Sequence, residues 1–426
     1  MSSQVRPGTK YLLWAGVFSC FIGSVLSIHA FGIEFFPLRV ISLAAFPFLL
    51  LQSVRKGRVI LRFSSSLLIL MLIYGFISLL WSPDPQLGFR SVGLLFTGVM
   101  FFLLMTRLAK DRGVLAKIML IWSIAILVTS LLGFYETLSA RYLFVFDESK
   151  LASIDRIRNS IGWLCPRVFW PNWNNFSFVN ALSAPVLLGW AFETRGLSRA
   201  FALGATILAI PLVFISYSRA AILGLLIGLT IIVFCFVIRP RSKRFALIFM
   251  LMIMGFGTVY FNSNAGGLWG KRIVSAMEKK WEVVDNSIRM YYYTNAVVSG
   301  TVDSFGFGKG LGASTVIING GSYHHYLLGI LAELGFWFFL GHCVLIVMVC
   351  LRLLKGVRRG KNVYWNCGLL ASCIAFPILC LGPSSIMGEG VYWLWLAFIV
   401  AFIEYDSNVM RLNNKQFQAG SIKCTS

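Results

Sequence analysis

Long apolar stretches separated by short polar connectors run through the whole chain. Segments of membrane-spanning length lie near 11–31, 34–52, 64–81, 90–106, 114–135, 174–192, 200–216, 219–238, 245–262, 326–351, 363–382 and 389–405. An α-helix needs about 20 apolar residues to cross a bilayer. The pattern therefore predicts an all-α polytopic membrane protein with about twelve transmembrane helices. It also predicts a single integral membrane domain over residues 1–426.

Composition agrees with this pattern and identifies the role of the charge. The chain is 58% hydrophobic and 13% charged, with a mean hydropathy of +0.78, which excludes a soluble domain. A formal net charge of +22 is also typical of nucleic-acid binding. The basic residues, however, gather in every second connector: RKGRVILR (55–62), RLAKDR (107–112), TRGLSR (194–199), RPRSKR (239–244) and LRLLKGVRRGK (351–361). Cytoplasmic loops carry such an excess, so we expect both termini inside, contact with membrane lipids, and no nucleic-acid partner.

The alternation leaves two long loops on the outer side, about 136–173 and about 263–325. The second predicts an amphipathic helix on the outer membrane surface, because apolar residues recur at helical spacing. These residues are Val274, Met277, Trp281, Val284, Ile288 and Tyr291.

Arg219 is the only charged residue in the apolar run 200–238. A guanidinium at membrane depth costs several kcal/mol unless it reaches water, an anion or a partner. The topology places it at the outer surface, where short loops are usually poor in Lys and Arg. Two interpretations follow: an anion binds there, or the side chain snorkels from a tight hairpin turn.

Four other ionisable residues are candidates for chemistry. Arg289 could bind an anion together with Arg219, since arginine holds pyrophosphate through paired hydrogen bonds, or it could form a surface ion pair with Asp285. His324 and His325 begin a predicted span at its outer end, where a neutral imidazole could act as a general base or as a hydrogen-bonding anchor. Glu333 lies within that span and needs a partner or a water-filled cavity.

The glycine-rich segment GFGKGLG (306–312) lacks the GK[ST] ending of a nucleotide-binding P-loop. It could bring the backbone amides of Gly308 and Gly310 near a phosphate, or it could simply be a turn. No DxD-type acidic pair occurs in an outer loop and no paired CxxC occurs at all, so we predict no metal site and no cofactor.

Five segments, in order along the chain, carry a resemblance to a known family. They are LLWSPDPQLGFRSVGLLF (79–96), RVFWPNWNNFSFVNAL (167–182), ISYSRAAILGLLIGL (215–229), IRMYYYTNAVVSGTVDSFGFGKGLG (288–312) and HHYLLGILAELGFWFFLG (324–341). With them the chain resembles the O-antigen ligase and O-antigen polymerase superfamily of bacterial membrane glycosyltransferases. One departure is His325, where the family usually has Asn.

The resemblance implies a metal-independent glycosyltransferase at the outer face of the bacterial cytoplasmic (inner) membrane. Its donor would be a glycan on undecaprenyl pyrophosphate and its acceptor a sugar hydroxyl of a glycolipid. The implied catalytic residues are Arg219 and Arg289, which bind the donor pyrophosphate, and His324, which activates the acceptor. We expect the substrate-binding residues to be Arg167, Asn172, His325, Glu333, Gly308 and Gly310.

Three functions remain open at this point. An O-antigen ligase of lipopolysaccharide biosynthesis, with lipid A–core as acceptor, is slightly favoured. A polymerase of O-antigen or exopolysaccharide, which joins lipid-linked repeats, has the same physical requirements. A transporter of lipid-linked oligosaccharide is more remote, because it would need the arginines but not His324.

Overall fold

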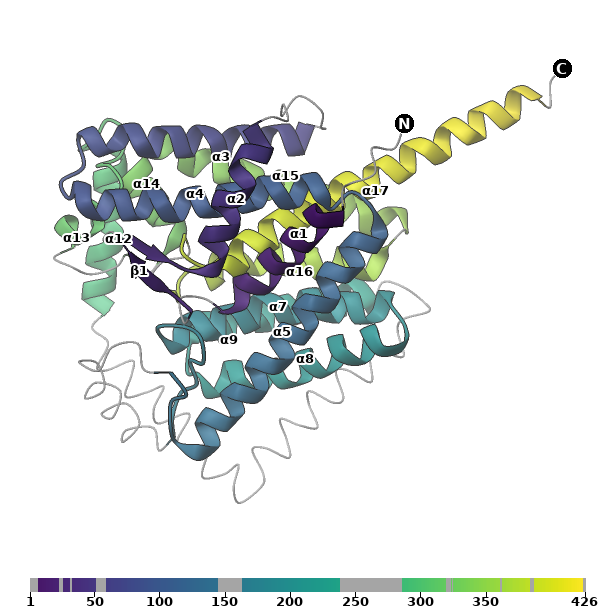
Figure 1. The fold of residues 1–426 in the computed structure, drawn as a ribbon, viewed down its shortest axis with the longest axis horizontal. Coiled ribbons are helices and arrows are strands. Elements are labelled where there is room, and N and C mark those ends of the chain that lie inside the picture. The colour runs from purple at the N-terminus through teal and green to yellow at the C-terminus, as the bar shows by residue number, and fades with distance from the viewer. Residues whose placement is uncertain are drawn as a thin grey trace.

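The computed structural model describes residues 7–22, 26–30, 33–50, 59–144, 163–237, 286–318, 323, 325–360, 362–383 and 387–423. This part of the chain is almost entirely helical, as predicted (Figure 1). Its helices are α1 (Pro7–Ile22), α2 (Pro37–Leu50), α3 (Val59–Ile77), η1 (Ser78–Leu80), α4 (Pro85–Leu108), α5 (Arg112–Ser139), α7 (Trp173–Glu193), α8 (Gly196–Ile215), α9 (Arg219–Val237), α12 (Asn286–Thr301), α13 (Ser314–Ile317), α14 (Tyr326–Leu334), α15 (Phe336–Arg359), α16 (Val363–Leu379) and α17 (Gly390–Lys423).

Seven helices of the described residues are long and apolar enough to cross a membrane. They cover Ile60–Leu80, Pro85–Leu108, Arg112–Ser139, Trp173–Glu193, Gly196–Ile215, Phe336–Arg359 and Gly390–Val409, and shorter apolar helices cover Lys10–Ile22, Pro37–Pro47, Arg219–Cys235 and Val363–Leu379. The multi-pass architecture is thus confirmed. The predicted span 245–262 and most of the predicted amphipathic helix lie outside the described residues. The count of twelve and the surface helix therefore stay predictions.

Two boundaries differ from the sequence-based expectation. The first helix ends at Ile22, and the rest of the predicted span 11–31 contains β1 (Ile28–Ala30), which pairs antiparallel with β2 (Ile33–Phe35). The predicted span 326–351 is broken at Gly335, whose φ of 91° is unfavourable for any residue with a Cβ. A Cβ there would also lie 2.3 Å from the carbonyl oxygen of Gly306. The break therefore separates the nine-residue α14, too short to span a bilayer, from α15.

Small residues let the central helices approach closely. In α7 and α17, 94% and 89% of the membrane-spanning stretch is buried, against 22% in α15, so these two helices form the centre of the bundle. A Cβ on Gly189 of α7 would lie 2.9 Å from the Cα of Gly368 on α16, and one on Gly98 of α4 would overlap the ring of Trp393 on α17. Such contacts are the usual basis of helix packing in membranes.

The two ends of the bundle differ in chemistry. We call one the site end: it comprises the α3–α4, α8–α9 and α16–α17 connections, residues 163–172 and the loop 302–313. The other, the basic end, comprises the α4–α5, α7–α8 and α15–α16 connections, where the side chains of Arg112 and Glu193 pair at 4.0 Å. The last part of α17 projects from the bundle opposite α12, α13 and α14 (Figure 1). Both ends follow the alternation of basic connectors, whereas the assignment of the basic end to the cytoplasm stays a prediction.

Candidate active site

Arg219 is the first residue of α9, directly after a tight turn at the site end. The turn is built by Tyr217, which has a φ of 55°, and by Ser218, whose carbonyl accepts the amide of Ile222. Arg219 itself is half-buried. A helix N-terminus carries a partial positive charge and disfavours a cation, whereas it favours an anion. Arginine at this position is therefore electrostatically consistent with an anion-binding role.

Aromatic packing holds this turn in place. The rings of Trp163 and Tyr217 lie 5.1 Å apart, and the Trp163 indole donates to the carbonyl of Ile215 at 3.1 Å. On its other side, a Cβ on Gly382 would lie 3.3 Å from the hydroxyl of Ser218. The turn is thus fixed between residues 163–172 and the α16–α17 connection.

His325 is the N-cap of α14. Its Nδ1 accepts the amide of Leu328 at 3.4 Å, and burial lowers the pKa of this histidine to about 4. The imidazole is therefore neutral at pH 7, and its proton resides on Nε2. Asn is among the best N-cap residues, so this histidine can take over the capping role of the family's usual Asn. His324 lies outside the described residues, and its assignment as the base stays a prediction.

Helix α12 carries Arg289 in its first turn. One turn further on, the ring of Tyr293 meets the ring of His325 at 6.0 Å, nearly perpendicular to it. A Cβ on Gly300 would lie 2.2 Å from the carbonyl oxygen of Leu331, so α12 crosses α14 in close contact. The structure thus brings the helix of Arg289 against the start of α14.

The backbone amides of the glycine-rich loop have hydrogen-bond partners within the protein. The amide of Gly308 donates to the hydroxyl of Ser304 at 2.9 Å, and the amide of Gly310 donates to the carbonyl of Glu333 at 2.9 Å. Both amides are therefore engaged within the protein, and the phosphate contact of these glycines stays a prediction. Gly310 has a φ of 89°, and a Cβ there would lie 2.7 Å from the carbonyl oxygen of Ser78, so glycine is needed for close packing.

The WSPDP turn at the start of α4 holds the same loop. The hydroxyl of Ser82 donates to the carbonyl of Leu311 at 2.6 Å, and the Trp81 indole donates to the carbonyl of Gly308 at 3.3 Å. Asp84 caps α4 by accepting the amide of Leu87 at 2.9 Å, next to Pro85 at the first helical position. Two of the segments that carry the family resemblance thus pack against each other.

Glu333 completes the support of the glycine-rich loop. Its carboxylate accepts the amide of Ser314 at 3.2 Å and a backbone hydrogen bond from Gly312, and burial raises its pKa to about 7. The buried carboxylate of Glu333 therefore has its hydrogen-bond partners in the backbone of the loop. Its described contacts give Glu333 a positioning role, and the substrate contact stays a prediction.

Arg167 is likewise held inside the protein. Only 2% of it is exposed, its guanidinium lies 4.0 Å above the ring of Tyr142, and it donates to the carbonyl of Phe144 at 2.9 Å. These contacts brace residues 163–172 against the end of α5, and the expectation that Arg167 binds substrate stays a prediction.

Asn172 also has a structural role, as the N-cap of α7. Its side-chain oxygen accepts the amide of Asn175 at 2.9 Å. This bond satisfies one of the free donors at the helix start. The described contacts of Asn172 thus give no support to the predicted substrate contact.

Two buried carboxylates were not found by the reasoning from sequence. Glu136, at the end of α5, accepts the amides of Leu143, Arg167 and Val168 at 3.0, 2.9 and 2.9 Å. Glu389, just before α17, accepts the indole of Trp170 at 3.0 Å and the amide group of Asn175, and burial raises its pKa to about 7. An isolated acid beside an apolar segment is the sequence feature that could have pointed to both.

Two segments that carry candidate site residues contact the described parts of α16–α17. The Arg219 turn contacts Gly382 at its start, while beyond its end Tyr392 accepts a hydrogen bond from the hydroxyl of Tyr326 at 3.1 Å, next to His325. Among the described residues no group of three His, Cys, Asp or Glu could hold a metal ion. Metal independence stays a prediction.

Comparison with known proteins points to the same family as the sequence motifs. The family described as O-Antigen ligase matches residues 204–343, which include the Arg219 turn, α12 and the glycine-rich loop. The chain is also 24% identical over 365 residues to the teichuronic acid biosynthesis protein TuaE of Bacillus subtilis (strain 168), covering 80% of this chain and 70% of that protein. These two matches confirm the resemblance found in the sequence, to the O-antigen ligase and polymerase superfamily.

Proposed function

We propose that the protein transfers a glycan from undecaprenyl pyrophosphate to a sugar hydroxyl of a second glycolipid, as a metal-independent glycosyltransferase at the outer face of the cytoplasmic membrane. The observation that carries the proposal is the position of Arg219. It begins α9 at the site end, on the turn that contacts the α16–α17 connection. An arginine and a helix N-terminus together form a binding site for phosphate oxygens.

In the proposed reaction, Arg219 and Arg289 bind the pyrophosphate through paired hydrogen bonds. His324 removes the proton of the acceptor hydroxyl, whose oxygen then attacks the anomeric carbon of the donor sugar. The bond between that carbon and the pyrophosphate oxygen breaks, and undecaprenyl pyrophosphate leaves with the electron pair. The arginines stabilise the negative charge that develops on this leaving group.

The support for ligase and for polymerase activity comes from different observations. The matching family is described as O-Antigen ligase, and we keep lipid A–core as the first candidate acceptor. The name of the relative refers to the biosynthesis of teichuronic acid. This relative favours a polymerase, in which another lipid-linked repeat is the acceptor.

The experiment uses purified full-length protein with a lipid-linked glycan donor, offered lipid A–core and a second lipid-linked repeat together. Arg219→Ala removes two charge-assisted bonds worth about 1.5–3 kcal/mol each, so kcat/KM should fall about 10²–10⁴-fold. Arg219→Lys should also be poor, because an ammonium cannot form the paired bonds. Arg195→Ala, an exposed arginine at the basic end, is the matched control and should transfer normally.

His324→Ala tests the chemical step. A general base contributes about 10²–10⁴-fold to turnover, so turnover should fall while donor binding, measured directly, stays nearly intact. His325→Ala should have a smaller effect, because His325 caps α14. Normal transfer by the Arg219→Ala or His324→Ala protein would refute the corresponding role. Movement of lipid-linked glycan across a bilayer without transfer would refute the enzyme and favour a transporter.

A further inference from the structure

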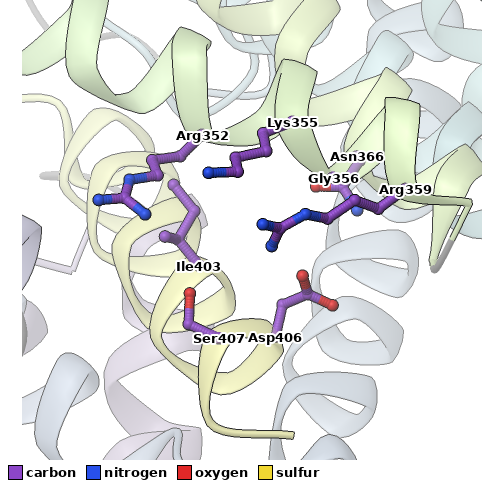
Figure 2. A pocket seen from close by; sticks show the side chains of 8 residues that line it. All are labelled: Arg352, Lys355, Gly356, Arg359, Asn366, Ile403, Asp406 and Ser407. Carbon is purple, nitrogen blue, oxygen red and sulfur yellow. The ribbon is translucent and has the colours of Figure 1, made fainter. Parts of the chain in front are cut away.

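A cleft opens at the basic end, where α15, α16 and α17 meet (Figure 2). About 310 Å³ of empty space lies between its lining residues, part of it continuous with the surroundings. Its lining consists of Arg352, Lys355, Gly356 and Arg359 from α15, Asn366 from α16, and Ile403, Asp406 and Ser407 from α17. None of these residues takes part in the proposed transfer.

Helical spacing and one close helix contact create this cleft. Arg352, Lys355 and Arg359 are three and four residues apart, so they lie on one face of α15. Gly356 lies on the same face, and a Cβ there would lie 2.4 Å from the side-chain oxygen of Asn366. The helices therefore touch beneath the cations. Figure 2 shows the charged ends of Lys355 and Arg359 directed over the space between α15 and α17.

The lining of the cleft carries more positive than negative charge. Three cations face one carboxylate, that of Asp406, which already accepts a hydrogen bond from the side chain of Asn362 at 3.0 Å. Like charges three and four residues apart on a helix repel each other. The C-terminal dipole of α15 stabilises basic residues in the last turn, but it does not account for Arg352, which lies two turns from the helix end.

The distance of the cleft from the site end, measured along α15, indicates its depth in the membrane. This helix begins beside the glycine-rich loop and runs for 24 residues to Arg359, a rise of about 35 Å. That length is close to the thickness of a bilayer. If the site end lies at one surface of the membrane, the cleft lies at the level of the opposite headgroups.

We propose that this cleft binds the phosphate of an anionic phospholipid headgroup in the leaflet opposite the candidate active site. The two arginine side chains supply paired donors for phosphate oxygens, and Lys355 supplies a third cation. The acyl chains would extend along the exposed apolar residues of α15, which include Val344, Val347 and Leu351. Basic clefts between transmembrane helices on the cytoplasmic side recognise such headgroups.

The test measures the thermal unfolding of purified full-length protein in neutral detergent. Three additives are compared: phosphatidylglycerol, phosphatidylcholine as the uncharged control, and inorganic phosphate. We expect stabilisation by phosphatidylglycerol only. The variant Arg352→Gln/Lys355→Gln removes two cations from the cleft, which should weaken the apparent affinity for phosphatidylglycerol about 30-fold. Native mass spectrometry of the same samples should show fewer bound phosphatidylglycerol molecules on the variant.

The matched control is Arg195→Gln/Arg199→Gln, which removes two cations at the basic end outside the cleft. It should keep the response of the unchanged protein. Equal loss in both variants would refute a specific site and indicate general attraction between the basic surface and anionic lipid. An equal response to inorganic phosphate would refute the lipid as the source of the anion. If the cleft variant unfolds without additive, Arg352→Lys replaces it, because lysine keeps the charge but lacks the paired donors of arginine. An unchanged affinity of Arg352→Lys for phosphatidylglycerol would refute the arginine contact.

Discussion

The structure of residues 163–172 depends on hydrogen bonds to the carboxylate of Glu136, and Glu136→Gln tests that dependence. No part of Glu136 is exposed. One oxygen accepts the amide of Leu143, and the other accepts the amides of Arg167 and Val168. Glutamine has the same shape but only one accepting oxygen. In its better orientation, the glutamine oxygen still accepts the amides of Arg167 and Val168. The amide of Leu143 then faces the glutamine NH₂ group, which is also a donor.

The expected cost follows from these three bonds. One buried donor without an acceptor costs about 1–3 kcal/mol. The two remaining bonds lose the charge of their acceptor, and a neutral bond is about half as strong as a charge-assisted one. Together the change should destabilise this region by about 2–4 kcal/mol. Because a tenfold change in an equilibrium corresponds to about 1.4 kcal/mol, local opening should become about 30- to 1,000-fold more frequent.

Hydrogen–deuterium exchange of the detergent-solubilised protein measures this opening directly. Peptides that cover 163–172 should exchange faster in Glu136→Gln by that factor, and peptides from the centre of α7 should not change. Asp303→Asn is the matched control, because the carboxylate of Asp303 is exposed and pairs with Lys309 at 3.6 Å. Such a surface pair contributes about 1 kcal/mol or less. Unchanged protection of 163–172 in Glu136→Gln would refute the role given to this carboxylate.

Three further predictions concern the glycine-rich loop, the buried acids and metal. Gly310→Ala should lower the unfolding temperature more than Gly196→Ala. Both glycines have a positive φ, but only at Gly310 would the new Cβ collide with another group, the carbonyl oxygen of Ser78. Equal effects of the two substitutions would contradict the packing argument. The pKa of Glu389 is raised from 4.5 to about 7, so the folded protein holds a proton that the unfolded chain releases, and the contribution of Glu389 to stability should fall by about 3 kcal/mol as pH rises from 4.5 to 7. The lowered pKa of His325 contributes with the opposite sign, so the effect of Glu389 has to be measured as a difference between variants. Compared with the unchanged protein, Glu389→Gln should become progressively more stable as pH rises from 4.5 to 7, and a difference between the two unfolding profiles that does not depend on pH would refute the raised pKa. Glycan transfer should continue in excess EDTA, whereas activity that only Mg²⁺ or Mn²⁺ restores would refute the arginine mechanism.

The sequence alone was sufficient for the class of the protein and the positions of its helices. Apart from two exceptions, the predicted spans within the described residues coincide with apolar helices, because the length of an apolar run and the basic connectors between runs are local properties. Helix starts could also be found locally, as with Asp84 before Pro85. The exceptions are the strand pair that follows α1 and the break at Gly335, where close contact with the backbone of Gly306 interrupts an apolar run.

Only the tertiary structure shows which polar residues have partners within the fold. Arg167, Asn172, Glu333 and the two loop glycines looked like substrate contacts in sequence, yet each has partners within the protein. Many of these partners are remote: Ser82 and Leu311, which join the WSPDP turn to the glycine-rich loop, are 229 residues apart. In a membrane protein the helices are apolar on the faces toward lipid and toward protein alike. Hydrophobic periodicity therefore cannot reveal which faces meet, and only the packed bundle separates polar groups with partners in the fold from the candidates for binding substrate.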